Sequence, residues 1–150
     1  MTGSVRSQTR GNRRTVLISL VVVFGLVGAS ALARPKDLDR SLDRVSDGGT
    51  FRVAVRSTRE PVPLFRVHQW TLRITDPSGR PVSDAAVSIH GGMPDHRHGL
   101  PTAPRATSAE TAGDYVINGV KFSMPGWWVL KLAVKAPDGR SDTITFNLVL

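Results

Sequence analysis

The chain has 150 residues, a net charge of +8 and no cysteine. The absence of cysteine excludes a disulfide framework and a thiolate metal site, and the length predicts one domain with a modest core. Four arginines near the amino terminus supply half of the net charge. No arginine stripe with interleaved aromatic residues follows them, so the composition does not predict nucleic-acid binding.

The amino terminus has the layout of an export signal. Residues 1–14 carry four arginines and no acid, residues 15–33 carry no charge, and the stretch ends in Ala31-Leu32-Ala33, a small-x-small sequence. We therefore expect an N-terminal hydrophobic helix within residues 1–33, either a cleaved signal peptide or an uncleaved membrane anchor. Because arginines that precede an apolar helix stay in the cytoplasm, both alternatives predict that residues 34–150 are exported, to the periplasm or the extracytoplasmic face of the cytoplasmic membrane.

A charged stretch follows the apolar one. Residues 34–48 mix basic and acidic side chains and contain few apolar ones. Such a segment buries too little apolar surface to offset the entropy of ordering it, so we expect a solvated linker here. A short amphipathic helix over Leu38–Val45 is the alternative. The folded domain is then expected to span residues 49–150.

From Thr50 onward, apolar side chains alternate with polar ones at a period of two, which is typical of half-buried strands. Turn sequences rich in proline, aspartate and glycine separate these stretches, and no helical period appears. The pattern predicts an all-β fold, an immunoglobulin-like antiparallel β-sandwich of about seven strands. The expected strands cover residues 50–56, 68–75, 85–90, 105–108, 114–120, 128–134 and 144–150.

Strand direction predicts where chemically useful side chains gather. If successive strands run antiparallel, the loops 57–67, 91–101 and 121–126 all lie at one end of the sandwich. This end is expected to face away from the linker and from any membrane, because the first strand rises from the linker. It carries five side chains with metal-ligating atoms: His68, Met93, His96, His98 and Met124.

The donor atoms at this end suit copper better than most metals. Imidazole binds both copper oxidation states, and the soft thioether of methionine favours Cu(I). Two histidines separated by one residue project from the same side of an extended backbone, so His96 and His98 are expected to chelate one ion. Zinc is the less favoured metal, because it would more often recruit a third histidine or a carboxylate such as that of Asp95.

Each of these residues also has a purely structural interpretation. The histidine pair is alternatively a solvated surface pair, and His68, which shares a strand face with apolar residues, is alternatively a buried, hydrogen-bonded histidine. Met93 and Met124 are alternatively core side chains that fill gaps at the end of the sandwich. Trp127 and Trp128 are adjacent and so point to opposite faces, one into the core and the other over this end or an interface.

Three stretches of the sequence together resemble the YtkA-like domain family. They are GGMPDHRHGLPTAPRAT at residues 91–107, Gly113-Asp114-Tyr115, and GVKFSMPGWW at residues 119–128. The resemblance covers about residues 68–150. It implies a small exported bacterial domain, often lipid- or membrane-anchored, with an immunoglobulin-type sandwich. The chain has no cysteine for a lipid anchor, so the membrane is expected as a partner only through an uncleaved N-terminal segment.

The same resemblance implies a site. The positions that match are Met93, His96, His98 and Met124, in a family that is thought of alongside exported copper-handling proteins. Relatives often have glycine where this chain has Arg97, and some have histidine at the place of Ser123. A cation beside the site disfavours a metal ion, and the second departure removes a potential ligand.

We therefore expect an extracytoplasmic, non-catalytic metal-binding domain that handles copper through its histidines and methionines. The alternative is a membrane-tethered protein-interaction module that binds no metal and docks a membrane or periplasmic partner through the same loops and an exposed tryptophan. An enzyme is not predicted, since no nucleophile–base pair or carboxylate pair has an assignable spacing.

Overall fold

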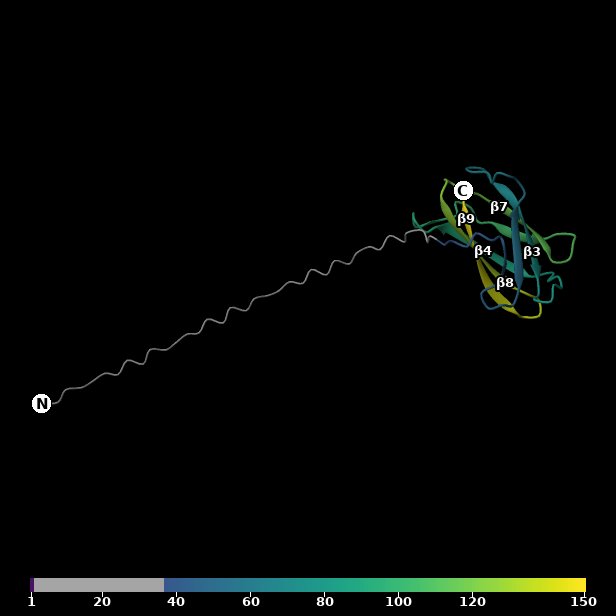
Figure 1. Cartoon of the computed structure of the whole chain (residues 1–150), viewed down its shortest axis with the longest axis horizontal. Helices are drawn as coiled ribbons and strands as arrows, with labels where there is room; N and C mark the ends of the chain where they lie inside the picture. Colours follow the sequence, from purple (N-terminus) through teal and green to yellow (C-terminus); the bar gives the residue numbers. More distant parts are fainter. Residues whose placement is uncertain (2–36) are drawn as a thin grey trace.

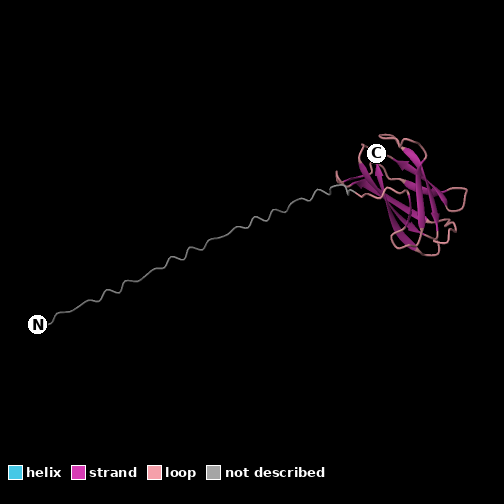
Figure 2. Ribbon diagram, viewed as in Figure 1, coloured by secondary structure: helices cyan, strands magenta, loops and turns pink. Residues whose placement is uncertain are grey.

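The computed structural model describes Met1 and residues 37–150, and the latter fold into two β-sheets that share one core (Figures 1 and 2). The described residues contain no helix, and so none that is long and apolar enough to cross a membrane. Apart from Met1, the expected N-terminal hydrophobic helix lies outside the described residues, as does the beginning of the linker.

Within residues 37–150, nine strands form the two sheets, and every neighbouring pair is antiparallel. The first sheet has the order β1-β2-β3-β7-β6, and the second has the order β5-β4-β8-β9. The all-β, antiparallel prediction is confirmed, and each of the seven expected strands is present. The bounds are β1 (Asp43–Val45), β2 (Arg52–Ser57), β3 (His68–Thr75), β4 (Ala86–Met93), β5 (His98–Gly99), β6 (Arg105–Ser108), β7 (Asp114–Val120), β8 (Trp127–Lys135) and β9 (Ser141–Val149).

The core lies between the sheets and is built from the inward positions of the period-two pattern. In β3, Trp70, Leu72 and Ile74 are buried, whereas the side chains between them are exposed. In β8, Trp128 is fully buried and Trp127 is half-buried, so the expectation that the two tryptophans face opposite ways is confirmed. Burying each large apolar side chain contributes about 1.5–3 kcal/mol to folding.

The structure corrects the second half of the expected linker. Asp43–Val45 pairs with β2 as an edge strand, so it forms neither a solvated linker nor the alternative helix over Leu38–Val45. Leu42 packs against the core, and Ser46 is buried. The sandwich therefore begins before the expected boundary at residue 49.

Hydrogen bonds to one carboxylate hold the residues that connect β1 to β2. Asp142, in β9, accepts hydrogen bonds from the Ser46 hydroxyl at 2.6 Å and from the main-chain N–H groups of Gly48 and Thr50 at 2.9 and 3.2 Å. These bonds, that from Ser46 above all, hold the pKa of Asp142 well below its usual range. A polar stretch is thus ordered by an acceptor 92 to 96 residues further along the chain, which hydrophobic patterning does not register.

The expected loop 91–101 is in fact a short hairpin, because β4 continues to Met93 and pairs with β5. Met93 lies opposite His98, and its carbonyl oxygen accepts hydrogen bonds from the N–H groups of His96 and Arg97 at 3.1 and 2.9 Å. Arg97 has a φ of 54°. The two histidines are therefore joined by a tight turn rather than by the extended backbone that the sequence suggested.

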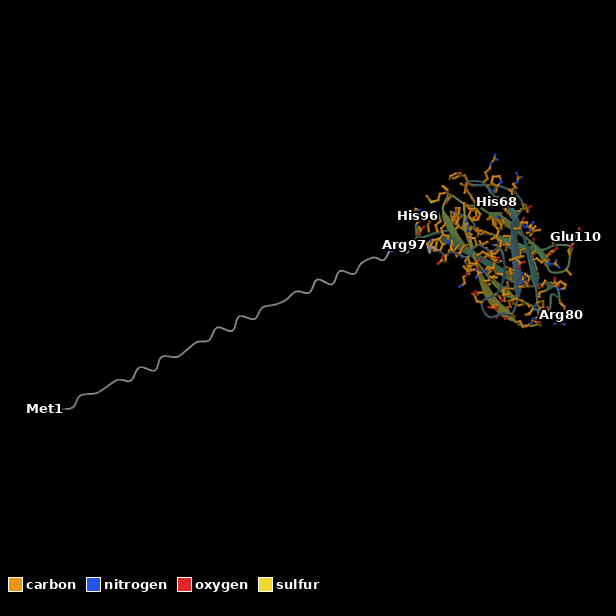
Figure 3. The ribbon with its side chains drawn as sticks, viewed as in Figure 1. Met1, His68, Arg80, His96, Arg97 and Glu110 are labelled. Atoms are coloured by element: carbon orange, nitrogen blue, oxygen red, sulfur yellow. The ribbon has the colours of Figure 1, made fainter. Side chains whose placement is uncertain are left out.

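The predicted gathering of loops at one end of the sandwich is confirmed. β3 begins where β7 ends, and β4 ends where β8 begins; the ring of Phe122, which follows β7, contacts both His68 and Trp128 and so brings these strand ends together. Figure 3 shows His68 and His96 at this end, with Arg80 at the other. We call this end the rim; its loops are residues 58–67, 94–97 and 121–126.

The chain reaches the sandwich at the rim. The sequence predicted the opposite, that the rim faces away from the point where the chain arrives. The main-chain oxygen of Asp39 accepts a hydrogen bond at 2.9 Å from the side chain of Asn147, near the rim end of β9. The oxygen of Leu42 accepts one at 2.8 Å from Val55, near the rim end of β2. The chain thus arrives at the rim, runs down β1 and returns along β2. The expectation assumed that β2 is the first strand. Because β1 precedes β2 and runs antiparallel to it, the chain arrives at the opposite end from the one expected.

Candidate functional site

A continuous series of aromatic and imidazole rings crosses the rim. The ring centroids are 5.7 Å apart for His68 and Phe122, 5.2 Å for Phe122 and Trp128, and 5.6 Å for Trp128 and His98. His98 in turn stacks on His96 at 6.0 Å. The first three rings are buried and the last two are exposed, so the series ends in a pair of accessible imidazoles.

The hairpin turn sets the geometry of this histidine pair. The ring planes of His96 and His98 are 25° apart and their centroids lie at 6.0 Å. Because a metal–imidazole bond is about 2.0–2.1 Å long, two rings that share an ion have centres about 5–6.5 Å apart. Nδ1 of His98 lies 3.2 Å from the carbonyl oxygen of Gly99. A proton donated there leaves Nε2 with a free lone pair, as in many metal-binding histidines.

Two residues that the sequence analysis did not assign to the site, Phe122 and Trp128, support the pair from the core. The indole N–H of Trp128 donates to the main-chain oxygen of Met124 at 3.1 Å, and its ring meets His98 edge to face. Trp128 therefore links the loop 121–126 to the histidine hairpin. The alternation of apolar residues marks Trp128 as core, but nothing in the sequence connects it to His98.

His68 lies in the core rather than among the candidate ligands. It is 6% exposed, and its Nε2 accepts a hydrogen bond from the indole N–H of Trp70 at 2.9 Å. Nδ1 therefore carries the proton and donates to the main-chain oxygen of Arg66 at 3.0 Å. Both ring nitrogens are engaged, which agrees with the structural alternative for this residue and not with the metal-ligand interpretation.

The two methionines occupy the core and its margin. Met93 is 2% exposed, and its terminal methyl lies against Gly126. A Cβ added to that glycine would be 2.7 Å from the methyl carbon of Met93. Met124 is half-buried and packs against the core. Directly opposed residues of an antiparallel pair have Cβ atoms about 4.5–5.5 Å apart, so Met93 lies beside His98. Of the two methionines, Met93 is thus the one that strand pairing places next to the histidine pair.

The surroundings of the pair are cationic rather than acidic. A shallow groove of about 370 Å³ on the outer side of the hairpin is lined by Arg97 and Lys131 among others, and Asp95 is the acid of the turn. Within the described part of the chain, no group of three or more histidine, aspartate, glutamate or cysteine residues could hold a metal ion. A metal at the rim would therefore depend on the two imidazoles, with a thioether or an external ligand beside them.

The model of the YtkA-like family matches residues 46–133, more than half of the chain. The chain belongs to the YtkA-like family. The match includes the histidine hairpin and the loop 121–126, so the resemblance seen in the sequence motifs is confirmed. No curated protein matches the sequence.

A solved structure agrees with the fold of this YtkA-like domain. The crystal structure of a DUF4426 family protein from Pseudomonas aeruginosa PAO1 superposes with a TM-score of 0.53 and 21% identity, covering 73% of this chain and 94% of that one. At this identity the likeness shows the fold alone. The ZirS C-terminal domain covers 99% of this chain and 97% of its own, at 10% identity and a TM-score of 0.37, which is too low to carry an argument.

The turn of this YtkA-like domain explains the glycine that the family resemblance implies at residue 97. Arg97, with a φ of 54°, lies in the left-handed region that glycine adopts without steric cost. An arginine here therefore accepts a strained backbone and adds a cation between His96 and His98. The arginine charge would oppose a metal cation at this turn, but both imidazoles are present.

Proposed function

We propose that this protein is an exported, non-catalytic domain that binds one copper ion at the rim through His96 and His98. The observation that carries the proposal is the stacked, exposed pair of imidazoles at 6.0 Å, one of which has its second nitrogen beside a backbone carbonyl. Met93, opposite His98, is the proposed third donor, reached by a rotation of its flexible side chain. Export is supported by the arginine-flanked apolar stretch near the amino terminus.

The donor set favours copper over zinc. Cu(I) accepts two or three ligands, and imidazole with thioether is a soft combination that suits it. Structural zinc is almost always held by four ligands, and catalytic zinc by three protein ligands and a water. The two imidazoles and the thioether of Met93 make three ligands of this soft kind, which suits Cu(I) better than zinc.

We further interpret the sandwich as immunoglobulin-like. Its support is a corner contact of Tyr115, at the start of β7. The tyrosine hydroxyl donates to the main-chain oxygen of Val82 at 2.7 Å and accepts from the N–H of Ala85 at 2.9 Å. Such a tyrosine corner, which fastens a strand to backbone upstream of it, is a hallmark of these sandwiches.

The metal-free interaction module has less support at the tryptophan on which it depended. Trp127 is half-buried, and its indole N–H donates to the side chain of Asn147 at 3.1 Å. The side chain is thus held against its own sheet. The copper proposal is therefore the one that we carry to experiment.

The test is a metal titration of residues 37–150, which contain both sheets and the whole of the described core. We would measure Cu(I) affinity without oxygen, in competition with a coloured chelator, and Cu(II) by absorption. His96→Ala and His98→Ala should each weaken binding roughly tenfold or more, which corresponds to about 1.4 kcal/mol. His90→Ala, an exposed histidine of β4, is the matched control and should bind as the unaltered protein does. Equal binding by all four proteins would end the proposal.

A further inference from the structure

The rim loop 58–67 exposes two large apolar side chains close together. Phe65 is 63% exposed and Val67 is 62% exposed, the highest fractions for large hydrophobic side chains within residues 37–150. A single exposed apolar side chain is ordinary on a protein surface. Two of them on one short loop, on either side of Arg66, form an amphipathic tip that needs an explanation.

The tip is held in place rather than loose. The N–H of Phe65 donates to the main-chain oxygen of Phe122 at 2.7 Å, and Leu64 forms a β-bridge with the same residue. Leu64 packs against the core, and Phe65 follows it with a φ of 62°, a conformation that bulky residues rarely adopt. The backbone is thus fixed in a strained conformation that directs the phenyl ring outward. Strain of this kind concentrates at sites that bind something.

The charges beside the tip are positive and unpaired. Arg59 and Arg66 are exposed, and across residues 37–150 neither lies within ion-pair distance of a carboxylate. Glu60, the one acid of the loop, instead lines a groove with Arg56 over the outer face of the first sheet. Two exposed apolar side chains and two exposed arginines on one loop match a lipid interface with anionic headgroups.

The position of the tip matches the same occupant. The chain reaches the sandwich at the rim, where Asp39 is bound to Asn147. Only residues 34–36 separate the described segment from the uncharged stretch 15–33. That stretch is long enough to span the hydrocarbon core of a bilayer. A membrane that held this stretch would therefore lie at the rim and not at the opposite end.

We propose that the tip docks onto an anionic lipid surface. Phe65 and Val67 enter the headgroup region, while Arg59 and Arg66 contact the lipid phosphates. The rim, with its histidine pair, then faces the membrane. This docking requires no metal and so stands or falls separately from copper binding.

Vesicle sedimentation of residues 37–150 tests the docking without any N-terminal anchor. The fragment should bind vesicles that contain phosphatidylglycerol more strongly than pure phosphatidylcholine vesicles. Replacing both Phe65 and Val67 with alanine should lower the partition coefficient roughly tenfold or more, because each apolar side chain contributes to the buried area. Replacing Arg59 and Arg66 with glutamine should abolish the preference for phosphatidylglycerol. Val45→Ala, at a 55% exposed valine of β1, is the matched control and should change nothing.

Three results would overturn the proposal. One is that the fragment shows no preference for phosphatidylglycerol vesicles; another is that the alanine pair binds them as the unaltered fragment does. The third is that analytical ultracentrifugation shows the fragment to be a dimer and the variant with both alanines to be a monomer, because the tip would then be a protein interface. Circular dichroism of each variant shows that the sandwich is intact, and a copper titration of the alanine pair separates the two proposals.

Discussion

Trp128 and His98 meet edge to face across the rim, with ring centroids 5.6 Å apart and ring planes at 67°. The indole is fully buried and the imidazole is exposed, so this contact joins the core to the accessible histidine pair. The same indole donates to the main-chain oxygen of Met124. One core side chain therefore holds the loop 121–126 by a hydrogen bond and packs against the ring of His98.

Trp128→Phe should lower both stability and copper affinity. Phenylalanine keeps an aromatic ring but removes the N–H donor, which leaves the Met124 carbonyl without this partner and shortens the wall beneath His98. We expect the free energy of unfolding to fall by about 1–3 kcal/mol, measured by urea denaturation, and Cu(I) affinity to fall with it.

Trp127→Phe is the matched control for this prediction. Its indole N–H donates to the side chain of Asn147 in the neighbouring strand β9, and the indole ring that meets His98 is that of Trp128. The loss of stability should be smaller and the copper affinity unchanged. If the two variants bind copper equally, Trp128 has no role in positioning His98.

Arg97→Gly should strengthen the turn and the metal site together. Glycine adopts a φ of 54° without strain, so the free energy of unfolding should rise by about 0.5–1 kcal/mol. Removing a cation beside the imidazoles should also raise the affinity for copper. Arg97→Ala separates the effects, since it removes the charge but keeps a Cβ at this position. Alanine should gain affinity without gaining stability; a stability gain for alanine equal to that of glycine would contradict the strain argument.

Asp142 should make the fold sensitive to acid. Its pKa in the folded protein is held well below the unfolded value of about 3.9, chiefly by the hydrogen bond from Ser46. The carboxylate therefore stabilises the fold fully above about pH 4, and this contribution is lost as the pH falls toward the folded pKa. Asp142→Asn should cost about 1–3 kcal/mol at neutral pH and make the decline of stability below pH 4 less steep, although not absent, because hydrogen bonds also lower the pKa of Asp76. Urea denaturation at several pH values measures this, and Asp95→Asn, in the exposed hairpin turn, should leave both quantities unchanged.

The sequence predicts the parts of this fold that hydrophobic periodicity encodes. Alternation identifies the seven longer strands, and strand parity correctly brings His68, His96 and Met124 to one end. It misses β1, because this three-residue edge strand carries no run of alternating apolar side chains and is defined by its pairing with β2, and this omission reverses the side from which the chain arrives. It also cannot decide the fate of His68, which depends on a hydrogen bond from Trp70 across the strand face.

His68 and His98 should respond in opposite ways to the same substitution, which tests the division of the rim into core and site. His68→Ala leaves the buried indole N–H of Trp70 without an acceptor, so the free energy of unfolding should fall by about 1–3 kcal/mol while Cu(I) affinity is retained. His98→Ala removes an exposed side chain whose hydrogen bond is to the neighbouring Gly99, so stability should change by less than about 0.5 kcal/mol while affinity is lost. Urea denaturation and chelator competition on the two variants measure both quantities. Loss of copper affinity in a folded His68→Ala variant would mean that the buried imidazole reaches the metal after all, and the site would have to be redrawn around it.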